Sequence, residues 1–553
     1  MVDNVYDEVG RLLVDKRNGV SELRTNYRYN LRSWLKGVSS PLFSQTLSYQ
    51  ETINDIAPCY NGNISSMFWR TAQNNASNAL ISSPEKGYSF TYDGLSRLKD
   101  AVYGEGASLN QNRNRFNEQI TGYDKMGNIL GLLRYGQTGT DSYGLIDNLN
   151  LTYHGNQLES VYDNATSCVF GNGMEFKDAA HETVEYAYDK NGNLTKDLNK
   201  NITGIQYNIL NLPSHIRFAD GSSIVYEYAA DGSKVRTTHT INDNVTSTVY
   251  CGNAIYENGS LKMLLNESGY YSFQDNKFHF YIKDHQGNVR VVADETGKVD
   301  EVNDYYPFGG LMSNVCNNVQ PYKYNGKELD RKGGLNWYDY GARMYDATLG
   351  RFMKTDRFSE KYVSLSPYQY GANNPVNNIE INGDSIIILS NPNGLIDCIK
   401  SYFGFDTQYQ KVVKANLSQL KEDGIVEQII NSLESSKNIH YITMPKGREG
   451  NSSSFDIIKA EKNIPQGSVV KYDPYTETDV KGEKRNPIVG LVHELTHSND
   501  ADKGTVTNDK TENNIKIMEV RAVNMENRIR KRTGDLKRTK YAGKEIPQKH
   551  LEW

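Results

Sequence analysis

The sequence predicts a multidomain protein, with a large β-rich repeat region over the N-terminal two thirds and a small α+β domain at the C-terminus. Of its 553 residues, 39 are tyrosine and 46 are glycine, and these residue types favour strands and turns, respectively. A Tyr-Asp unit recurs along the first region. After Gly383 the unit stops and apolar residues take up helical spacing, which indicates a second kind of domain.

The recurring unit consists of Tyr-Asp, a few further residues, Gly-Asn or a similar pair, and then an apolar residue. Each copy reads as the end of a strand, a tight turn and the start of a returning strand. A single hairpin cannot bury its apolar face, so the copies are expected to stack into one extended sheet that curls on itself. The tyrosines and aspartates are therefore interpreted as packing and turn residues. The copies begin at Tyr6, Tyr92, Tyr123 and Tyr188, with weaker ones at Tyr207, Tyr228 and Asp284.

Composition and charge argue against several classes of protein. The net charge of −5 gives no global sign of binding to nucleic acid or membranes. No apolar run reaches the roughly 18 residues of a membrane-spanning helix, and the first residues lack the pattern of a signal peptide. Secretion or surface display is therefore expected by a route that needs no signal peptide. The five cysteines lack C-x-x-C spacing and are interpreted as incidental thiols.

A long signature follows the repeats. Its clearest parts are Tyr324-Asn-Gly326-Lys-Glu328, Trp337-Tyr338-Asp339-Tyr340, Leu349-Gly350-Arg351-Phe352 and Ser366-Pro367-Tyr368-Gln369-Tyr370. With the repeats, this stretch resembles the YD-repeat, or Rhs, family and its Rhs-associated core domain. The resemblance implies a hollow β-shell over residues 1–321, a core domain over 322–384 and a variable C-terminal toxin domain over 385–553. It also implies a cognate immunity protein as a binding partner. About 300 residues are few for such a shell, and whether it closes is left open.

In many members of that family the core domain cleaves the chain at its own C-terminal edge by an aspartyl-type reaction. The family's Asp-Pro-x-Gly pattern reads Glu380-Ile381-Asn382-Gly383 here, and an earlier Asp-Pro reads Asp356-Arg357. Because two carboxylates that share a proton need close and definite geometry, self-cleavage is not expected. Arg351, Asp356 and Glu380 are the positions that would carry it. Alternatively, Arg351 and Asp356 form an ion pair that holds the core together.

The C-terminal domain contains the motif H-E-x-x-H, as His493-Glu494-Leu495-Thr496-His497. Histidines at i and i+4 share one helical face, so both can bind one metal ion, and the glutamate can take a proton from metal-bound water. Asn486-Pro487 predicts the start of this helix, as an N-cap followed by proline at N1. The apolar residues that follow predict a helix anchored in a core rather than a solvated helix with two accidental histidines.

Periodicity predicts the other elements of this domain. Strands are expected at 385–390, 440–444 and 468–472, helical structure over 408–436, and a last helix from about 514 to 532. In zinc peptidases, a strand just ahead of the motif helix commonly holds the substrate by backbone hydrogen bonds. Residues 467–473 are placed to do this.

A catalytic zinc ion needs a third protein ligand and an open position for water. No third histidine follows at the metzincin spacing, so a carboxylate from later in the chain is expected. Glu519, on the next predicted helix, is the first choice. Glu526 falls on the same face and could instead orient one of the motif histidines. Asp500 and Asp502 are further alternatives.

Several short motifs surround the H-E-x-x-H helix. They are Tyr472-Asp473-Pro474, Glu519-Val-Arg521-Ala522-Val523 and Arg538-Thr-Lys-Tyr541. On these motifs, residues 440–545 resemble the M91 family of zinc metallopeptidase effectors. The resemblance implies a zincin-like domain that cleaves a protein in a target cell. It implies the following roles: Zn²⁺ ligands His493, His497 and Glu519, and general base Glu494. Tyr541 could stabilise the oxyanion or simply pack.

Two other functions stay open at this point. The chain could be a structural cell-surface or secreted repeat protein with an inactive tip. Alternatively, the tip could be a toxin that acts on nucleic acid through the basic stretch from Arg528 to Lys540. Cations near a helix C-terminus are more simply interpreted as solvated partners of the helix dipole, so nucleic acid is not the expected partner.

Overall fold

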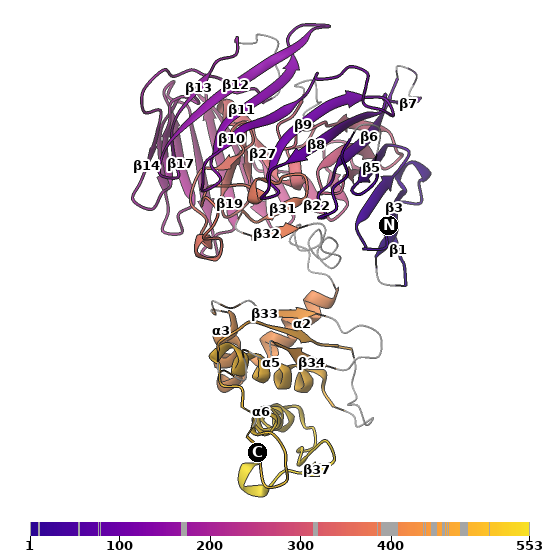
Figure 1. Ribbon diagram of the computed structural model, residues 1–553, viewed down its shortest axis with the longest axis vertical. Coiled ribbons are helices and arrows are strands. Elements are labelled where there is room, and N and C mark those ends of the chain that lie inside the picture. The colour runs from indigo at the N-terminus through magenta and orange to yellow at the C-terminus, as the bar shows by residue number, and fades with distance from the viewer. Residues whose placement is uncertain are drawn as a thin grey trace. The chain divides into compact units, whose positions relative to one another are not determined.

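The computed structural model describes residues 2–551, apart from 9–10, 53–55, 167–173, 313–318, 389–407, 444–450, 456–458, 476–484 and the positions 76, 78, 384, 435, 437, 439, 460, 461, 463 and 508. The chain divides into two compact units, Met1–Phe405 and Asp406–Trp553 (Figure 1). The described part of the first unit is built from large antiparallel sheets, and that of the second mixes helices with short strands. This confirms the predicted β-rich region followed by a small mixed region.

Two antiparallel sheets of 13 strands each make up the described part of the repeat region. The first runs from β1 (Val2–Tyr6) to β13 (Gln157–Asp163), and the second from β14 (Tyr186–Tyr188) to β26 (Val299–Val302). Strands pair in sequence order, except that β7 (Leu80–Ser82) lies off the path and pairs with β6. Such a meander is the arrangement that successive hairpins produce when they stack.

The remaining elements of the repeat region follow in chain order. In the first sheet they are β2 (Leu12–Arg17), β3 (Thr25–Tyr29), β4 (Leu35–Ser39), β5 (Phe43–Ser48), β6 (Ser66–Asn74), β8 (Lys86–Tyr92), β9 (Leu98–Glu105), β10 (Glu118–Tyr123), β11 (Ile129–Gln137) and β12 (Tyr143–His154). In the second they are β15 (Leu194–Asp197), β16 (Ile202–Tyr207), β17 (Pro213–Phe218), β18 (Ser223–Tyr228), β19 (Lys234–Ile241), β20 (Asn244–Cys251), β21 (Ala254–Glu257), β22 (Ser260–Asn266), β23 (Gly269–Ser272), β24 (Lys277–Lys283) and β25 (Val289–Asp294). Short 3₁₀ turns are η1 (Ser21–Leu23), η2 (Tyr324–Gly326), η3 (Lys332–Gly334), η4 (Ser359–Lys361), η5 (Gly371–Asn373) and η6 (Gln548–His550).

The aspartate of the Tyr-Asp unit holds each turn in the same way. One carboxylate oxygen of Asp189 accepts hydrogen bonds from the backbone N–H groups of Asn191 and Asn193, at 2.8 and 2.9 Å. Its second oxygen accepts the Asn193 side-chain amide at 2.8 Å. Asp124 and Asp284 repeat this pattern with the asparagine four residues on. The aspartates are therefore turn residues, as predicted.

The tyrosine of the unit ties neighbouring hairpins together. Its hydroxyl donates to the carbonyl oxygen of the residue that directly follows the turn of an earlier hairpin. The pairs are Tyr123 to Leu98 and Tyr207 to Leu194, both at 2.6 Å. Tyr153, which is outside the recurring unit, donates in the same way to Ile129 at 2.7 Å. A tyrosine thus satisfies a backbone acceptor while its ring packs on the sheet, which explains why the unit needs this residue.

Replacing Asp189 by alanine is expected to destabilise the first unit by about 2–3 kcal/mol. The change leaves two backbone N–H groups and the Asn193 amide without their acceptor. Lys190, exposed in the same turn, supplies the matched control, because Lys190→Ala should shift the unfolding free energy by less than about 0.5 kcal/mol. Urea unfolding of the full chain followed by tyrosine fluorescence measures both. Equal stability of the two variants would contradict the role given to the aspartate.

The two large sheets contact each other along both of their sides. Near the start of the second sheet, the backbone N–H of Glu185 donates to the carbonyl of Glu159 at 2.8 Å. On the other side, Asn74 of β6 donates to the carbonyl of Val299 in β26 at 3.2 Å, and Arg17 of β2 donates to that of Tyr281 at 2.8 Å. The described strands therefore close around a common interior, in spite of the short repeat region.

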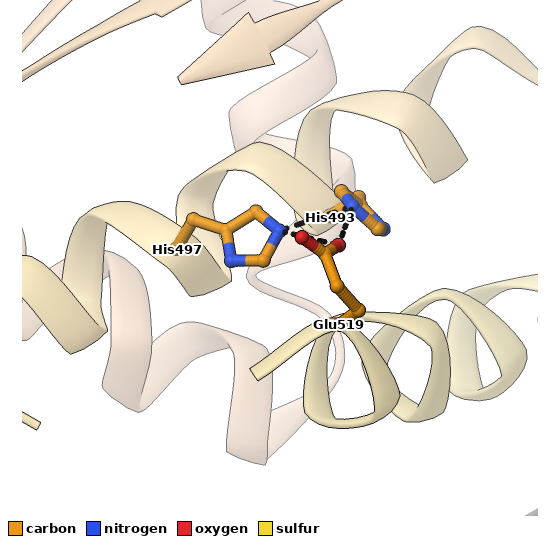
Figure 2. A group of neighbouring side chains, drawn as sticks. All are labelled: His493, His497 and Glu519. Carbon is orange, nitrogen blue, oxygen red and sulfur yellow. Dashed lines mark hydrogen bonds and ion pairs between the residues drawn. The ribbon is translucent and has the colours of Figure 1, made fainter. Parts of the chain in front are cut away.

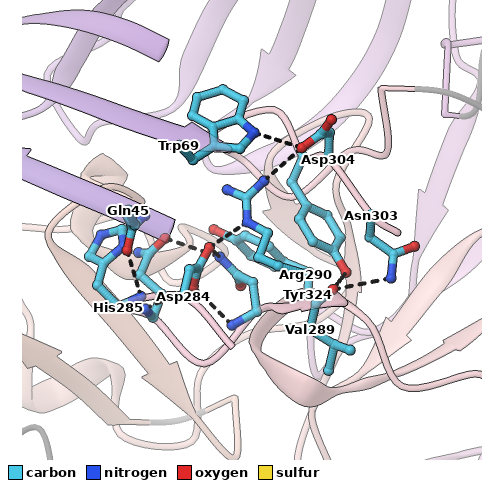
Figure 3. A network of polar contacts seen from close by, with 12 residues as sticks. Gln45, Trp69, Asp284, His285, Val289, Arg290, Asn303, Asp304 and Tyr324 are labelled. Atoms are coloured by element: carbon cyan, nitrogen blue, oxygen red, sulfur yellow. Dashed lines mark hydrogen bonds and ion pairs between the residues drawn. The ribbon is translucent and has the colours of Figure 1, made fainter. Parts of the chain in front are cut away.

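A buried polar network also joins β6 and β8 of the first sheet to β25 of the second (Figure 3). Asp304 accepts the indole N–H of Trp69, from β6, at 2.7 Å and pairs with Lys86, from β8, at 2.6 Å. Arg290 of β25 donates to Asp284 at 2.8 Å and reaches Asp304 at 3.4 Å. Burial acts to raise the pKa of Asp304, but Lys86 and Arg290 outweigh it and hold that pKa below its usual value. The carboxylate thus stays charged between the two sheets.

The segment after β26 fills the interior of the closed sheets. It forms a small sheet of β27 (Glu328–Asp330), β28 (Trp337–Asp339), β29 (Met344–Asp346) and β30 (Arg351–Phe352). Side chains of this segment and of both large sheets belong to one hydrophobic cluster. Its aromatic members include Tyr88, Tyr226, Phe308, Tyr324, Trp337, Tyr345 and Tyr370. In the described part of the chain, side chains of this segment therefore occupy part of the interior that the resemblance implied to be hollow.

The positions considered for self-cleavage lie in this segment but do not all meet. The Arg343 guanidinium lies 3.0 Å from Asp356 and 3.3 Å from Glu380, and it also donates to the carbonyl of Gly383. Arg351 donates instead to the carbonyl of Asn156 at 3.0 Å. The alternative ion pair between Arg351 and Asp356 is therefore wrong, because Arg343 pairs with the aspartate.

The second unit contains four described α-helices around a three-stranded sheet. The helices are α2 (Gln408–Leu420), α3 (Gly424–Glu434), α5 (Pro487–Lys503) and α6 (Ile517–Thr533). The sheet order is β33 (His440–Thr443), β35 (Ser468–Lys471) and β34 (Ser452–Ser454), and a hairpin of β36 (Lys540–Tyr541) and β37 (Lys544–Glu545) follows α6. The predicted helical stretch 408–436 is thus two helices. None of the described helices is long and apolar enough to cross a membrane.

The motif helix α5 begins as predicted. The side chain of Asn486 caps it by accepting from the backbone N–H of Ile488 at 3.1 Å, and Pro487 is its first residue. Most of the helix is buried, and its apolar side chains form a core with Val426 and Ile430 of α3 and with Val470 of β35. This core fixes the helix that carries the two histidines.

One strand prediction is wrong, and a second predicted strand occurs as expected. Residues 467–473 were expected to form the edge that holds a substrate, but β35 is the central strand, parallel to β33 and antiparallel to β34. Both of its edges are already paired, so it has no free edge to offer. The strand expected at 385–390 occurs as β32 (Ser385–Ile388) and pairs with β31 (Asn378–Ile381), so it belongs to the first unit.

Candidate metal centre

Helices α5 and α6 bring three metal-ligating side chains together (Figure 2). The Nε2 atoms of His493 and His497 lie 3.1 Å apart. One carboxylate oxygen of Glu519 lies 3.2 Å from Nε2 of His497 and 3.5 Å from Nε2 of His493. Two ligands come from successive turns of one helix, and the third comes from the neighbouring helix.

The geometry of these three groups fits a zinc ion. With zinc–ligand bonds of about 2.0–2.1 Å and tetrahedral angles, neighbouring ligand atoms are about 3.3–3.4 Å apart. The observed separations of 3.1, 3.2 and 3.5 Å bracket this value. Among the described residues the group has three members, which leaves the fourth tetrahedral position for water or substrate. Structural zinc sites have four protein ligands, whereas catalytic sites have three and an open position.

The electrostatics of the site favour a cation between the three side chains. Burial disfavours a charged His493, but contacts with Glu519 and Glu526 outweigh it and raise the pKa of the imidazole to about 9. For Glu519, burial acts to raise the pKa, but His493 and His497 hold it far below its usual range. A proton and a metal ion therefore compete for the same position, and metal binding releases the proton.

Glu494 directly follows the first histidine on α5 and is 8% exposed. Its negative charge adds a small upward contribution to the pKa values of His493 and Tyr541. A glutamate in this position is suited to take a proton from a water molecule beside the metal position.

Tyr541 reaches the site from β36. Its ring is parallel to that of His493, with 6.2 Å between the ring centroids. Burial raises the pKa of its hydroxyl, and the negative charge of Glu519 adds to this effect. The tyrosine ring therefore lies next to the first motif histidine.

The other carboxylates considered as third ligand lie elsewhere. Glu526 approaches the far side of the His493 ring, with 2.7 Å between its Oε1 and Nδ1. Asp500 pairs with Arg521 at 3.0 Å. Asp502 accepts hydrogen bonds from Asn438 at 2.8 Å and from His440 at 3.2 Å. Of the four candidates, the structure brings Glu519 alone to the converging nitrogen atoms.

The basic stretch of α6 is largely paired with carboxylates. Arg528 lies 3.2 Å from Asp423, and Arg532 lies 2.5 Å from Glu422. Arg538 lies 2.7 Å from Glu526. The pairing of Arg538 with Glu526 could not be predicted from the sequence. The two residues meet only when α6 and the segment after it fold together.

Comparison with known proteins places these observations in a family context. Residues 400–529 match the profile of the family Peptidase_M91, described as "Effector protein". Over 210 residues the chain is 31% identical to salivary gland surface protein 1 of Aedes aegypti, covering 37% of this chain and 6% of that protein. Over 286 residues it is 27% identical to the tRNA3(Ser)-specific nuclease WapA of Bacillus spizizenii, covering 45% of this chain and 12% of that protein.

Among solved structures, the crystal structure of TcdB2-TccC3-TEV aligns with 69% of this chain and 20% of that chain, at 15% identity and a TM-score of 0.46. The chain thus spans only a small part of the relatives that it matches. The metal-ligating residues His493, His497 and Glu519 all lie within the stretch that matches the M91 profile. The stretch that holds these three residues is therefore similar to the M91 effector family, and a large β-rich region precedes it.

Proposed function

We propose that the protein is a toxin whose C-terminal domain is a zinc-dependent endopeptidase. The observation that carries this proposal is the convergence of His493, His497 and Glu519 at separations suited to tetrahedral zinc. Glu494 follows His493 directly on the same buried helix. The match of residues 400–529 to an effector family supports it. The β-rich region would act as the carrier of this domain.

The chemistry follows from the placement of the side chains. Bound zinc supplies a Lewis acid that polarises the peptide carbonyl and acidifies a water molecule. Glu494 takes the proton of the attacking water and delivers it to the leaving amine. The hydroxyl of Tyr541 donates a hydrogen bond to the negative charge that develops on the carbonyl oxygen.

The substrate chain is proposed to bind along β34. This strand lies at the end of the three-stranded sheet, next to the central strand β35, and packs against α5. An extended peptide can add to such an edge through backbone hydrogen bonds, which would hold a protein substrate beside the motif helix. The proposed partners are therefore a protein in a target cell and a cognate immunity protein that blocks the site.

A nuclease tip is the second candidate, because the WapA relatives are named as tRNA nucleases. The stretch aligned with them covers 45% of this chain, which is longer than the whole unit Asp406–Trp553. Much of that likeness therefore falls on the β-rich region. The pairing of Arg528 and Arg532 with carboxylates also leaves less positive charge for a phosphate backbone.

One experiment tests both candidates. The zinc-loaded full chain is incubated with an extract of bacterial cells, and new protein N-termini are labelled and identified by mass spectrometry. Total tRNA is incubated in parallel. We expect new N-termini that disappear when a chelator removes zinc, and intact tRNA. Cleaved tRNA without new N-termini would favour the nuclease, and no change in either sample would argue for an inactive tip.

A further inference from the structure

Glu526 contacts the metal site from the side that faces away from the metal position. Its Oε1 lies 2.7 Å from Nδ1 of His493, while Nε2 of the same ring faces His497 and Glu519. The two nitrogen atoms of this imidazole are thus divided between the metal position and a buried carboxylate. Glu526 is 1% exposed, so water does not compete with it for the ring.

A segment beyond α6 holds Glu526 in place. The guanidinium of Arg538 lies 2.7 Å from Oε1 of Glu526, and Nε of Arg530 lies 3.5 Å from Oε2. The backbone of Arg538 is fixed in turn by the side chain of Asn527, which is fully buried. The Asn527 amide donates to the carbonyl of Arg538 at 3.0 Å and accepts its backbone N–H at 2.8 Å.

These contacts form one continuous chain from the surface to the metal position. Arg538 is 27% exposed at its side chain and also lies over the ring of Tyr541, with 5.3 Å to its centroid. It stands outside residues 400–529, the part that matches the family profile. The segment after α6 therefore contributes both the hydroxyl of Tyr541 and the guanidinium that binds Glu526.

We propose that Glu526 is a positioning residue that fixes the His493 imidazole for zinc binding, and that Arg538 holds Glu526 for this task. The negative charge of Glu526 beside Nδ1 favours the proton on that nitrogen atom, which leaves the lone pair of Nε2 for the metal position. Glu526 is not a fourth ligand, because the ring lies between it and the metal position. The inference rests on the proposed function of the site.

The test measures zinc binding of the full-length chain rather than its activity. The dissociation constant for zinc is obtained by competition with a chromophoric chelator, and the visible absorption of the cobalt(II) form reports the ligand geometry. Glu526→Gln is expected to weaken zinc binding about 10–100-fold and to alter the cobalt spectrum. Arg538→Met is expected to weaken it less, by about 3–10-fold, because Arg530 still lies near Glu526.

Glu422→Gln is the matched control, because it removes a glutamate that pairs with Arg532 on the surface of the same unit. It should leave the zinc affinity and the cobalt spectrum unchanged. Wild-type affinity and spectrum in Glu526→Gln would overturn the positioning role while leaving the proposed zinc site intact. Zinc affinity equal to that of the wild type in Arg538→Met would overturn the role proposed for Arg538. This outcome can be read even if Glu526→Gln fails to fold. Absence of zinc from the wild type would overturn the proposed function itself.

Discussion

Replacing His493 by alanine is expected to lower the zinc content of the full-length chain from one ion per molecule to none. The variant keeps only His497 and Glu519, whose Nε2 and Oε2 atoms are 3.2 Å apart, and two ligands do not form a zinc site of the kind that resists dialysis. It also leaves Glu526 without the imidazole that it contacts. Elemental analysis after dialysis against a weak chelator measures the difference.

His550→Ala provides the control for this experiment. His550 lies in the same unit but pairs with Glu512 at 3.3 Å, outside the metal-ligating group. This variant should keep one zinc ion per chain. Because bound zinc stabilises the folded state, the wild type and the control should also melt at a higher temperature with zinc than without it, and His493→Ala should not. Zinc bound as tightly by His493→Ala as by the wild type would contradict the assignment.

The turns and the strand order of the first unit could be predicted because both are determined locally. Asp189 meets its partners within four residues, and this short range leaves a visible pattern in the sequence. Hairpins that follow one another at short spacing then pair in order. The filled interior could not be predicted in this way. It depends on contacts such as that between Trp69 and Asp304, which are 235 residues apart.

Long-range pairing also explains the errors near the core. Arg351 and Arg343 both precede Asp356 by a few residues, and nothing in the sequence distinguishes them as its partner. The structure turns Arg351 toward Asn156, which is 195 residues away, and this leaves Arg343 for the carboxylates. Similarly, β34 is a short polar strand without an apolar pattern, so its position beside β35 could not be predicted from the sequence.

Of the candidate metal site, the sequence predicts the pair of histidines, because helix geometry alone determines their relative position. The spacing of His493 and His497 places them on one face of α5 without reference to the rest of the fold. Glu519 and Glu526 are seven residues apart and share a face of α6, so periodicity cannot separate a ligand from a positioning residue. The packing of α6 against α5 separates them, since it presents Glu519 to Nε2 and Glu526 to Nδ1 of one imidazole.

The exchange of Glu494 for glutamine separates metal binding from chemistry at this site. Glutamine has the size of glutamate but cannot accept the proton of the attacking water, so peptide cleavage is expected to slow by about 10³-fold or more, or roughly 4 kcal/mol in the barrier. Zinc content should stay at one ion per chain, because the ligand group of His493, His497 and Glu519 is untouched. The rate at which new N-termini appear in the target-cell extract measures the loss, with Glu512→Gln as an active control. Cleavage at the wild-type rate by Glu494→Gln would show that another group serves as the base.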